Sequence, residues 1–181
     1  MRPRLAILTL VCATLAFPQI AAVRAPRPQN LEYEVKAAFL LNFTKFIDWP
    51  TAASPPASTT SFNICIAGED PFGVILDQTV RGETVNGRPL EVLRLGHSSP
   101  KNCQILYISR TEPGTKELLG SLGPGVLTVG ENDTFIRTGG MIAFILDNRR
   151  VRFSINIGAT RSAMLTLSSR LLSVAKSVET K

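Results

Sequence analysis

The sequence predicts a single α/β domain with a mixed, mostly parallel sheet flanked by helices, a late antiparallel hairpin and a C-terminal helix. Short apolar runs alternate with segments of helical spacing from residue 62 onward, which is typical of parallel strands joined by crossover helices. The last third changes to two consecutive strands separated by a short polar turn. The chain of 181 residues is 44% hydrophobic and 19% charged, so it can bury a core and is not a disordered polypeptide.

The N-terminal segment has the pattern of a secretory signal. Two arginines precede the apolar stretch Leu5–Phe17, and small residues follow it. This stretch is too short to span a bilayer. We therefore expect residues 1–22 to be a signal peptide, with cleavage after Ala22 or Ala25, and a single domain over residues 30–181.

An amphipathic helix is expected at the start of the mature chain. Asn30 is placed at its N-cap, and apolar residues recur with helical spacing from Leu31 until Trp49-Pro50 ends the element. The stripe contains four aromatic side chains: Phe39, Phe43, Phe46 and Trp49. Core packing is the expected role of such a stripe, and a pocket for a partner or a small ligand is the alternative. The Ser-, Thr- and Pro-rich segment Thr51–Ser61 is predicted to be a surface loop.

Strands and helices alternate through the middle of the chain. Strands are predicted over residues 62–67, 90–95, 103–109 and 126–129. Helices are predicted over residues 72–79 and 115–122, with a turn over 68–73 before the first of them. We expect the strands to be parallel neighbours joined by right-handed crossovers.

The last third predicts a hairpin followed by a helix. Strands over 141–146 and 151–157 flank Asp147–Arg150, whose Asx residues tolerate turn conformations. Gly139-Gly140 before this hairpin is expected to permit a bend or a bulge. A final helix over 159–178 is expected to turn five apolar side chains toward the core: Met164, Leu167, Leu171, Ala175 and Val178.

Residues that carry chemistry are sparse. The single histidine, His97, is predicted to be an exposed loop residue, and a general base for Ser98 or Ser99 is the alternative. One histidine and two widely separated cysteines do not supply a zinc ligand set. Residues 82–89 have the glycine spacing of a P-loop, but Arg88-Pro89 replaces the lysine and hydroxyl that phosphate and magnesium need. We therefore expect no catalytic residue, no metal and no cofactor, and a hydrolase is the weaker alternative.

A periplasmic small-molecule-binding module is the stronger alternative to a protein-binding role. It would use the crevice at the carboxyl end of the sheet, with Glu69, Asp70 and His97 as candidate ligand-binding residues. Backbone N–H groups at such a strand–helix junction can hold an anion. Because two acidic residues there would repel phosphate, a tight turn and helix cap is the favoured interpretation of residues 68–73.

Positive charge gathers at one place in the sequence. The net charge is +6, but the basic residues are scattered apart from one cluster at Arg149, Arg150 and Arg152, so no nucleic-acid partner is expected. The cluster is either a solvated hairpin tip or a guanidinium patch for an acidic protein surface. The candidate partner-binding residues on the hairpin and the C-terminal helix are Asn148, Arg149, Arg150, Arg152, Arg161 and Arg170.

Two cysteines, Cys65 and Cys103, lie beyond the predicted signal. An even pair in an exported chain favours a disulfide over two buried thiols in neighbouring strands. Closing this loop of the unfolded chain would stabilise the fold by about 3 to 4 kcal/mol.

Several motifs resemble those of the YfiR family of exported bacterial proteins. The most specific is the segment YEVKAAFLLNFTKF over residues 33–46, followed by Trp49-Pro50. Further matches follow in the family's order at residues 62–65, 68–73, 86–90, 103, 139–142 and 151–156. The resemblance spans nearly the whole mature chain.

The resemblance implies a periplasmic repressor. The best understood members bind the periplasmic sensor domain of an inner-membrane diguanylate cyclase, keep it inactive, and are sequestered by an outer-membrane lipoprotein. The implied partners are therefore the periplasmic domain of such a cyclase or of a histidine kinase, an outer-membrane lipoprotein, and a second copy of the chain. Cys65 and Cys103 match one disulfide of the family, whereas the second pair of better known members, near the late hairpin, is absent here.

Overall fold

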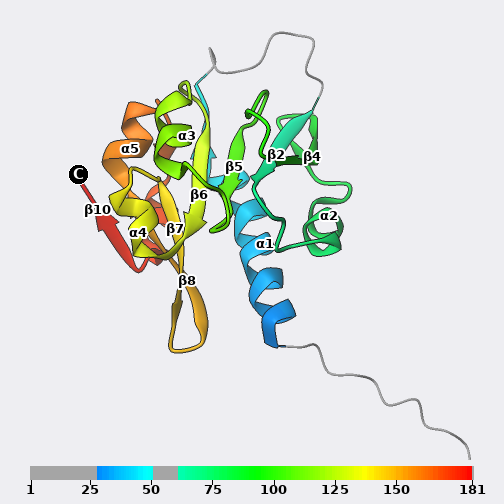
Figure 1. Ribbon diagram of the computed structural model, residues 1–181, viewed down its shortest axis with the longest axis horizontal. Coiled ribbons are helices and arrows are strands. Elements are labelled where there is room, and N and C mark those ends of the chain that lie inside the picture. The colour runs from blue at the N-terminus through cyan, green and yellow to red at the C-terminus, as the bar shows by residue number, and fades with distance from the viewer. Residues whose placement is uncertain (1–27, 51–60, 181) are drawn as a thin grey trace, which may run out of the picture.

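An eight-stranded sheet forms the centre of the molecule, in the order β10-β8-β7-β6-β5-β2-β4-β3 (Figure 1). The computed structural model describes residues 28–50 and 61–180, so the predicted signal and all but Ser61 of the predicted loop lie outside the described residues. Five neighbouring strands are parallel: β4 (Arg88–Gly96), β2 (Phe62–Ala67), β5 (Ile105–Ile108), β6 (Leu127–Glu131) and β7 (Ile142–Asp147). The predicted α/β class and its mostly parallel sheet are confirmed.

Helix α1 (Pro28–Phe46) covers one face of this sheet. Phe43 is fully buried, and its ring lies 5.4 Å from the ring of Phe153. Phe39, Phe46 and Trp49 pack against the same core, which confirms the predicted core role of the aromatic stripe. The predicted N-cap at Asn30 is wrong because the helix already begins at Pro28, a residue that the first turn tolerates well for lack of an N–H to satisfy.

Helix α1 ends earlier than the predicted stop at Trp49-Pro50. The helix ends at Phe46, and β1 (Ile47–Asp48) pairs with β9 (Thr166–Leu167) in a separate two-stranded sheet. Helix α2 (Val74–Val80) packs beside α1 and contributes Leu76 and Val80 to the same core. The opposite face of the large sheet carries α3 (Thr115–Ser121) and α4 (Asn132–Arg137), of which α4 was not predicted.

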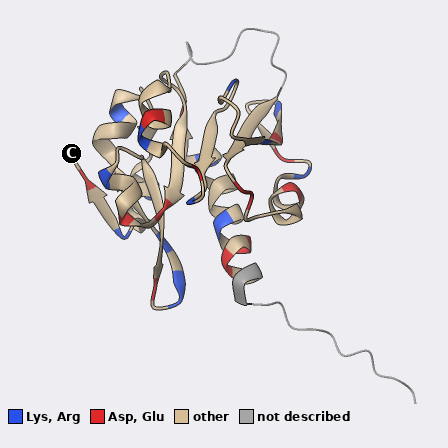
Figure 2. Cartoon of the chain, viewed as in Figure 1, with Lys and Arg blue, Asp and Glu red and all other residues tan. Residues whose placement is uncertain are grey.

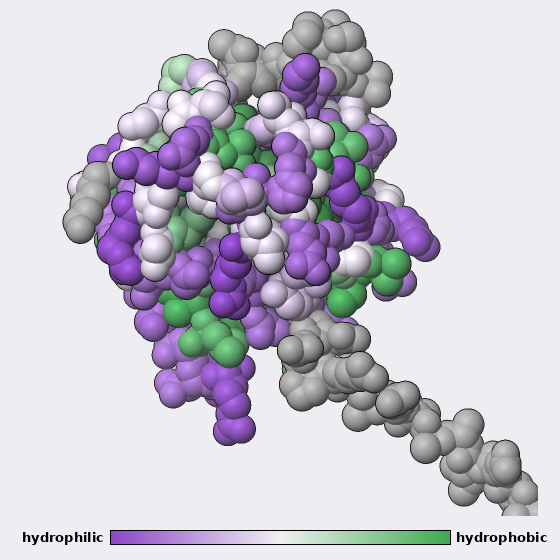
Figure 3. Space-filling model, viewed as in Figure 1, coloured by the Kyte–Doolittle hydropathy of each residue, from purple (hydrophilic) through white to green (hydrophobic). Residues whose placement is uncertain are grey.

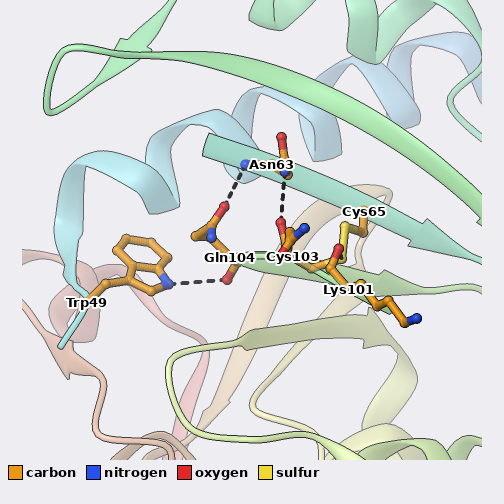
Figure 4. The surroundings of a disulfide bond; sticks show 7 residues. Trp49, Asn63, Cys65, Lys101, Cys103 and Gln104 are labelled. Atoms are coloured by element: carbon orange, nitrogen blue, oxygen red, sulfur yellow. Dashed lines mark hydrogen bonds between the residues drawn. A yellow bond between two sulfur atoms is a disulfide. The ribbon is translucent and has the colours of Figure 1, made fainter. Parts of the chain in front are cut away.

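The predicted disulfide between Cys65 and Cys103 is confirmed, with the two Cα atoms 5.7 Å apart (Figure 4). It joins β2 to the residues that lead into β5. Gln104 lies beside it and accepts a hydrogen bond from the Asn63 backbone N–H at 2.7 Å and, through its own carbonyl oxygen, one from the Trp49 indole at 3.2 Å. The disulfide therefore lies beside hydrogen bonds that also hold Trp49, three residues after the end of α1, against Gln104.

The segment with P-loop-like glycine spacing forms a hairpin instead. Strand β3 (Thr84–Val85) pairs antiparallel with the start of β4, and Val85 lies opposite Arg88. The turn between them consists of Asn86 and Gly87, with φ values of 51° and 77°. Asn-Gly is favoured in two-residue hairpin turns because both positions need positive φ.

The late hairpin is confirmed, with β7 antiparallel to β8 (Arg150–Asn156). Gly139 has a φ of 109°, as the expected bend before the hairpin requires. Gly140 and Gly130 both lie against the ring of Phe135, where a Cβ atom on Gly130 would come within 2.5 Å of that ring. These two glycines let β6, α4 and the start of β7 pack closely.

The predicted continuous helix over 159–178 is wrong. The segment contains α5 (Ile157–Ser162), β9, α6 (Ser169–Val174) and β10 (Ser177–Glu179), which pairs parallel with β8. Met164 has a φ of 59° and follows the end of α5, while the Ser168 hydroxyl caps α6 by accepting from the Leu171 N–H. Leu171 is buried as expected, but Met164 and Val178 are 55% and 42% exposed.

Candidate functional site

The β7–β8 hairpin projects beyond the rest of the sheet beside the N-terminal end of α1 (Figure 1). Its turn is the residue pair Asn148 and Arg149, with φ values of 47° and 62°, and Asp147 lies opposite Arg150. Strand β6 ends at Glu131, which pairs with Phe144, so the outer part of β7 has no β6 neighbour. The hairpin tip therefore leaves the sheet as a two-stranded ribbon.

The inner part of the contact between α1 and the hairpin is closed by aromatic rings. Phe144 pairs with Phe153 across the hairpin, and both rings contact Phe39 and Phe43 of α1 at centroid distances of 5.2 to 6.1 Å. Phe144, Phe153 and Phe43 are each at most 2% exposed. This part of the contact belongs to the core.

Helix α1 and the hairpin both continue toward the hairpin tip, but there the space between them is not filled by side chains. Leu146 pairs with Val151 on the face of the hairpin that carries the two phenylalanines. Leu31 and Val35 precede Phe39 at four-residue intervals and share its face of α1. Between them lies a cavity of about 490 Å³, here termed the hairpin groove, which is lined by Leu31, Glu32, Val35, Leu146, Arg149, Arg150 and Val151.

The hairpin groove exposes apolar side chains. Leu31 and Leu146 are each 57% exposed and Val35 is 37% exposed. In Figure 3, apolar side chains gather where the hairpin leaves the body, and hydrophilic side chains cover its tip. A cluster of exposed large apolar residues with a polar rim is typical of an interaction surface.

The rim of the hairpin groove is positively charged. Lys36 Nζ lies 2.6 Å from Glu32 Oε1 and also bonds the buried Glu131, so that Lys36 and Arg110 together balance these two carboxylates. Arg149 and Arg150 line the groove, while Arg152 lies on the opposite face of the hairpin. All three are exposed, and no carboxylate of residues 28–50 or 61–180 lies within salt-bridge distance of them. Figure 2 shows this basic stretch on the projecting hairpin.

The buried carboxylate of Glu131 lies at the end of β6, next to the hairpin groove. The Glu131 side chain is 6% exposed. Its Oε1 accepts hydrogen bonds from Lys36 Nζ at 2.7 Å, from the Tyr107 hydroxyl at 2.6 Å and from the Tyr33 hydroxyl at 3.3 Å. Its Oε2 accepts one from Arg110 Nε at 2.8 Å. The cluster thereby joins α1 to β5 and β6.

Burial and neighbouring charges shift the pKa values of Glu131, Tyr33 and Tyr107 in this cluster. Burial is the largest influence on Glu131 and opposes its ionisation, but the hydrogen bonds from Lys36 and Tyr107 together with the neighbouring positive charges outweigh it and lower its pKa. Burial, followed by the Glu131 charge, raises the pKa of Tyr33 to about 12 and raises the pKa of Tyr107 strongly. Glu131 therefore stays ionised and both tyrosines stay protonated donors, an arrangement suited to fixing α1 in place.

Sequence reasoning did not single out this cluster as a site. The signals that point to it are a glutamate at the end of a fully buried strand and a lysine within the buried part of an apolar helix. A second cavity of about 330 Å³ adjoins the cluster at Arg110 and Glu131 and shares Glu32, Leu146 and Val151 with the hairpin groove.

The predicted crevice residues have mainly structural partners. Asp70 Oδ1 accepts from the N–H groups of Phe72 and Gly73 at 2.8 and 3.2 Å, and its Oδ2 accepts from Arg94. These bonds confirm the predicted tight turn over residues 68–73, whereas Gly73 occupies the N-cap of α2 and no side chain caps the helix. The Glu69 backbone N–H donates to the Thr111 hydroxyl.

His97 is the exposed loop residue that the sequence predicts, with 69% of its side chain exposed and Nδ1 2.8 Å from Glu112 Oε2. A ligand-binding role of Glu69, Asp70 and His97 stays a prediction. In the part of the chain that the structure describes, no group of three or more His, Cys, Asp or Glu side chains is placed to hold a metal ion.

The six predicted partner-binding residues fall into two groups. Asn148, Arg149, Arg150 and Arg152 belong to the hairpin, near the N-terminal end of α1. Arg161 lies on α5, which follows the inner end of β8. Arg170 lies on α6, which joins the C-terminal end of α1 through a hydrogen bond from the Ser168 N–H to the Phe46 carbonyl. Because α1 has 19 residues and is about 28 Å long, the two groups cannot form one compact patch.

Comparisons with known proteins agree with the sequence motifs. None of the described helices combines the length and apolar character needed to cross a bilayer. A search of curated proteins returned no match. The model of a protein family described as YfiR/HmsC-like matches residues 33–176, which include most of α1, the disulfide and the whole projecting hairpin. Because this match covers well over half of the sequence, the chain belongs to the YfiR/HmsC-like family.

Proposed function

We propose that this protein is an exported periplasmic regulator that binds the sensor domain of an inner-membrane diguanylate cyclase and holds the enzyme inactive. Its action would lower the concentration of cyclic di-GMP. The observation that carries the proposal is the family match over residues 33–176, since the YfiR/HmsC-like family suggests a periplasmic regulator of diguanylate cyclase signalling. The repressor role and direct contact with the sensor domain go beyond that match.

The geometry is consistent with binding rather than turnover. The hairpin groove offers open apolar surface and uncompensated arginines, which are features that protein partners recognise. The buried Glu131 carboxylate is paired with Lys36 and hydrogen-bonded by Tyr107; its pKa is lowered and the pKa of Tyr107 is raised, so both move away from neutrality. A catalytic acid or base is most effective with a pKa near the working pH, so this cluster is poorly suited to that role.

We assign the sensor domain to the hairpin group of predicted residues: Asn148, Arg149, Arg150 and Arg152. Arg161 and Arg170 would serve a separate contact at the other end of α1, with an outer-membrane lipoprotein or a second copy of the chain. A histidine kinase in place of the cyclase would use the same surface. A membrane protein encoded next to this gene that carries a cyclase or histidine-kinase output would identify which output is controlled.

The test combines binding with signalling in the native host. We expect the exported protein to bind the purified periplasmic domain of that neighbouring membrane enzyme saturably in isothermal titration calorimetry. Deleting the gene is expected to raise cyclic di-GMP, and complementation is expected to restore it. Absence of binding together with unchanged cyclic di-GMP would overturn the proposal, and metabolite turnover that is lost in His97→Ala would favour a hydrolase instead.

A small-molecule sensor module is the second candidate. The cavity of about 330 Å³ beside Arg110 and Glu131 favours it, because a guanidinium, carboxylates and an apolar wall of Phe144 and Ile145 converge there. Thermal stabilisation by one compound from a panel of nucleotides and amino acids would support this role. Lack of a shift across the panel would favour the protein-binding role alone.

A further inference from the structure

We infer that the hairpin groove docks an amphipathic segment of the partner protein, which inserts one or two large apolar side chains between α1 and the hairpin and places carboxylates beside Arg149 and Arg150. This inference rests on the proposed function and adds to it the location of the contact and the chemistry of the partner segment.

The apolar part of the argument comes from the inner half of the same contact. There, four phenylalanine rings fill the space between α1 and the hairpin. Toward the hairpin tip, one to two helical turns along α1, the positions of these rings are taken by Leu31, Val35 and Leu146. The space between these three side chains is open to solvent. A branched or aromatic side chain placed in this space would continue the packing that the core already shows. Such buried anchors dominate the affinity of protein interfaces.

The charged part of the argument comes from the rim. Lys36 and Arg110 together balance Glu32 and Glu131, and Asp147 pairs with Lys176. The net charge beside the groove therefore comes from the hairpin arginines, which have no carboxylate within salt-bridge distance among the described residues. A guanidinium can hold a carboxylate through two parallel hydrogen bonds. The turn contains only Asn148 and Arg149, so Arg149 starts from a defined backbone position. An acidic residue flanking the apolar anchor therefore complements the groove, and a basic one is repelled.

An anionic membrane shares this combination of apolar and acidic chemistry, but the shape of the groove favours a protein segment. Leu31, Val35 and Leu146 line a recess between two elements. The outermost residues of the hairpin are Asn148 and Arg149, which are polar. A protein that inserts into lipid presents apolar side chains at its most protruding point. A recess instead receives single side chains.

The first experiment measures the affinity of the exported protein for the cognate sensor domain after Leu146→Asp. This exposed position should tolerate a charge without unfolding, so the variant is expected to keep its circular dichroism spectrum and to bind about tenfold or more weakly. Val174→Asp is the matched control, because Val174 is similarly exposed at 56% but lies on α6. The control is expected to bind as the unchanged protein does.

The second experiment tests the charge of the partner segment. Arg149→Glu combined with Arg150→Glu is expected to slow association and to weaken the dependence of binding on salt. The control pair, Lys116→Glu on α3 with Arg137→Glu on α4, changes two exposed cations on the opposite face of the sheet and is expected to leave both unchanged. Reversing an acidic residue of the sensor domain to lysine should restore binding to the first pair only.

The outcomes separate this inference from the proposed function. If the unchanged protein binds the sensor domain and both groove variants bind equally well, the inference is overturned while the proposed function stands. If the unchanged protein binds no sensor domain, the proposed function fails first. Binding to phosphatidylglycerol vesicles that Leu146→Asp abolishes, without any binding to the sensor domain, would overturn the inference in favour of a membrane.

Discussion

The inner and outer halves of the contact between α1 and the β7–β8 hairpin are built by the same two elements but differ in exposure. In the inner half, Phe43 is fully buried among aromatic rings. In the outer half, Leu31 and Leu146 are each more than half exposed. The change occurs where β6 ends at Glu131, opposite Phe144. Apolar periodicity alone therefore does not bury a side chain, because burial also requires a neighbouring strand or helix to close the layer.

This comparison suggests a division of labour along one helix. The inner half is buried in the core of the domain, whereas the outer half is the part that we propose binds another protein. Lys36 lies at the boundary, where its bond to Glu131 fixes the exposed end of α1 to the sheet. A recognition surface held in this way loses little conformational freedom on binding.

The largest expected effect is on the inner half. Phe43→Ala should lower the free energy of unfolding by about 3 to 5 kcal/mol, because it leaves a cavity in a closed aromatic cluster. Leu31→Ala, the matched change in the outer half, should cost less than about 1 kcal/mol. Urea unfolding followed by circular dichroism measures both. Similar losses in the two variants would contradict the distinction between the halves.

An intermediate effect is expected at the boundary. Glu131→Gln should lower the free energy of unfolding at pH 7 by about 1 to 3 kcal/mol, because buried donors lose their charged acceptor. In the unchanged protein the pKa of Glu131 is lowered by folding. Its contribution to stability is therefore present above the unfolded value of 4.5 and is lost as the pH falls through the lower folded pKa.

Urea unfolding between pH 7 and pH 3 measures this contribution. Glu131→Gln should show a shallower loss of stability in acid than the unchanged protein. Asp133→Asn removes an exposed carboxylate two residues further along, and is expected to keep the steeper profile. If the free energy of unfolding falls equally steeply with acid in the unchanged protein and in Glu131→Gln, the ionised Glu131 does not stabilise the fold as proposed.

The smallest effect is expected in the outer half itself. Leu146→Ser should change the free energy of unfolding by no more than about 0.5 kcal/mol, because this side chain is already largely in water. The same urea experiment provides the measurement. A loss approaching that of Phe43→Ala would mean that the hairpin groove is closed in solution.

Much of the fold could be predicted because local pattern and tertiary environment agree. Strand β2 matches its predicted range of 62–67, since a short apolar run that is buried on both faces leaves little choice of element. The C-terminal segment could not be predicted in the same way. Its apolar residues keep a helical period across Met164 and Ser168, but one adopts a left-handed conformation and the other caps a new helix.

The candidate site could be predicted only in part. The arginines of the hairpin tip stand out in the sequence as its one basic cluster. The groove does not, because Leu31 and Val35 continue the apolar spacing of α1, and nothing local marks where β6 stops. The Glu131 cluster joins residues up to 98 positions apart, and this proximity follows from the strand order together with the packing of α1 on the sheet.

The hairpin turn has a consequence for sequence variation within this family. With only two residues between Asp147 and Arg150, the turn has no slack to absorb an insertion or a deletion. Inserting or deleting one residue would turn Leu146 or Val151 to the opposite face of the hairpin. Helix α1 would then face the side chains that now point away from it. Surface loops usually tolerate changes in length, but this one should be as constant in length as a buried strand.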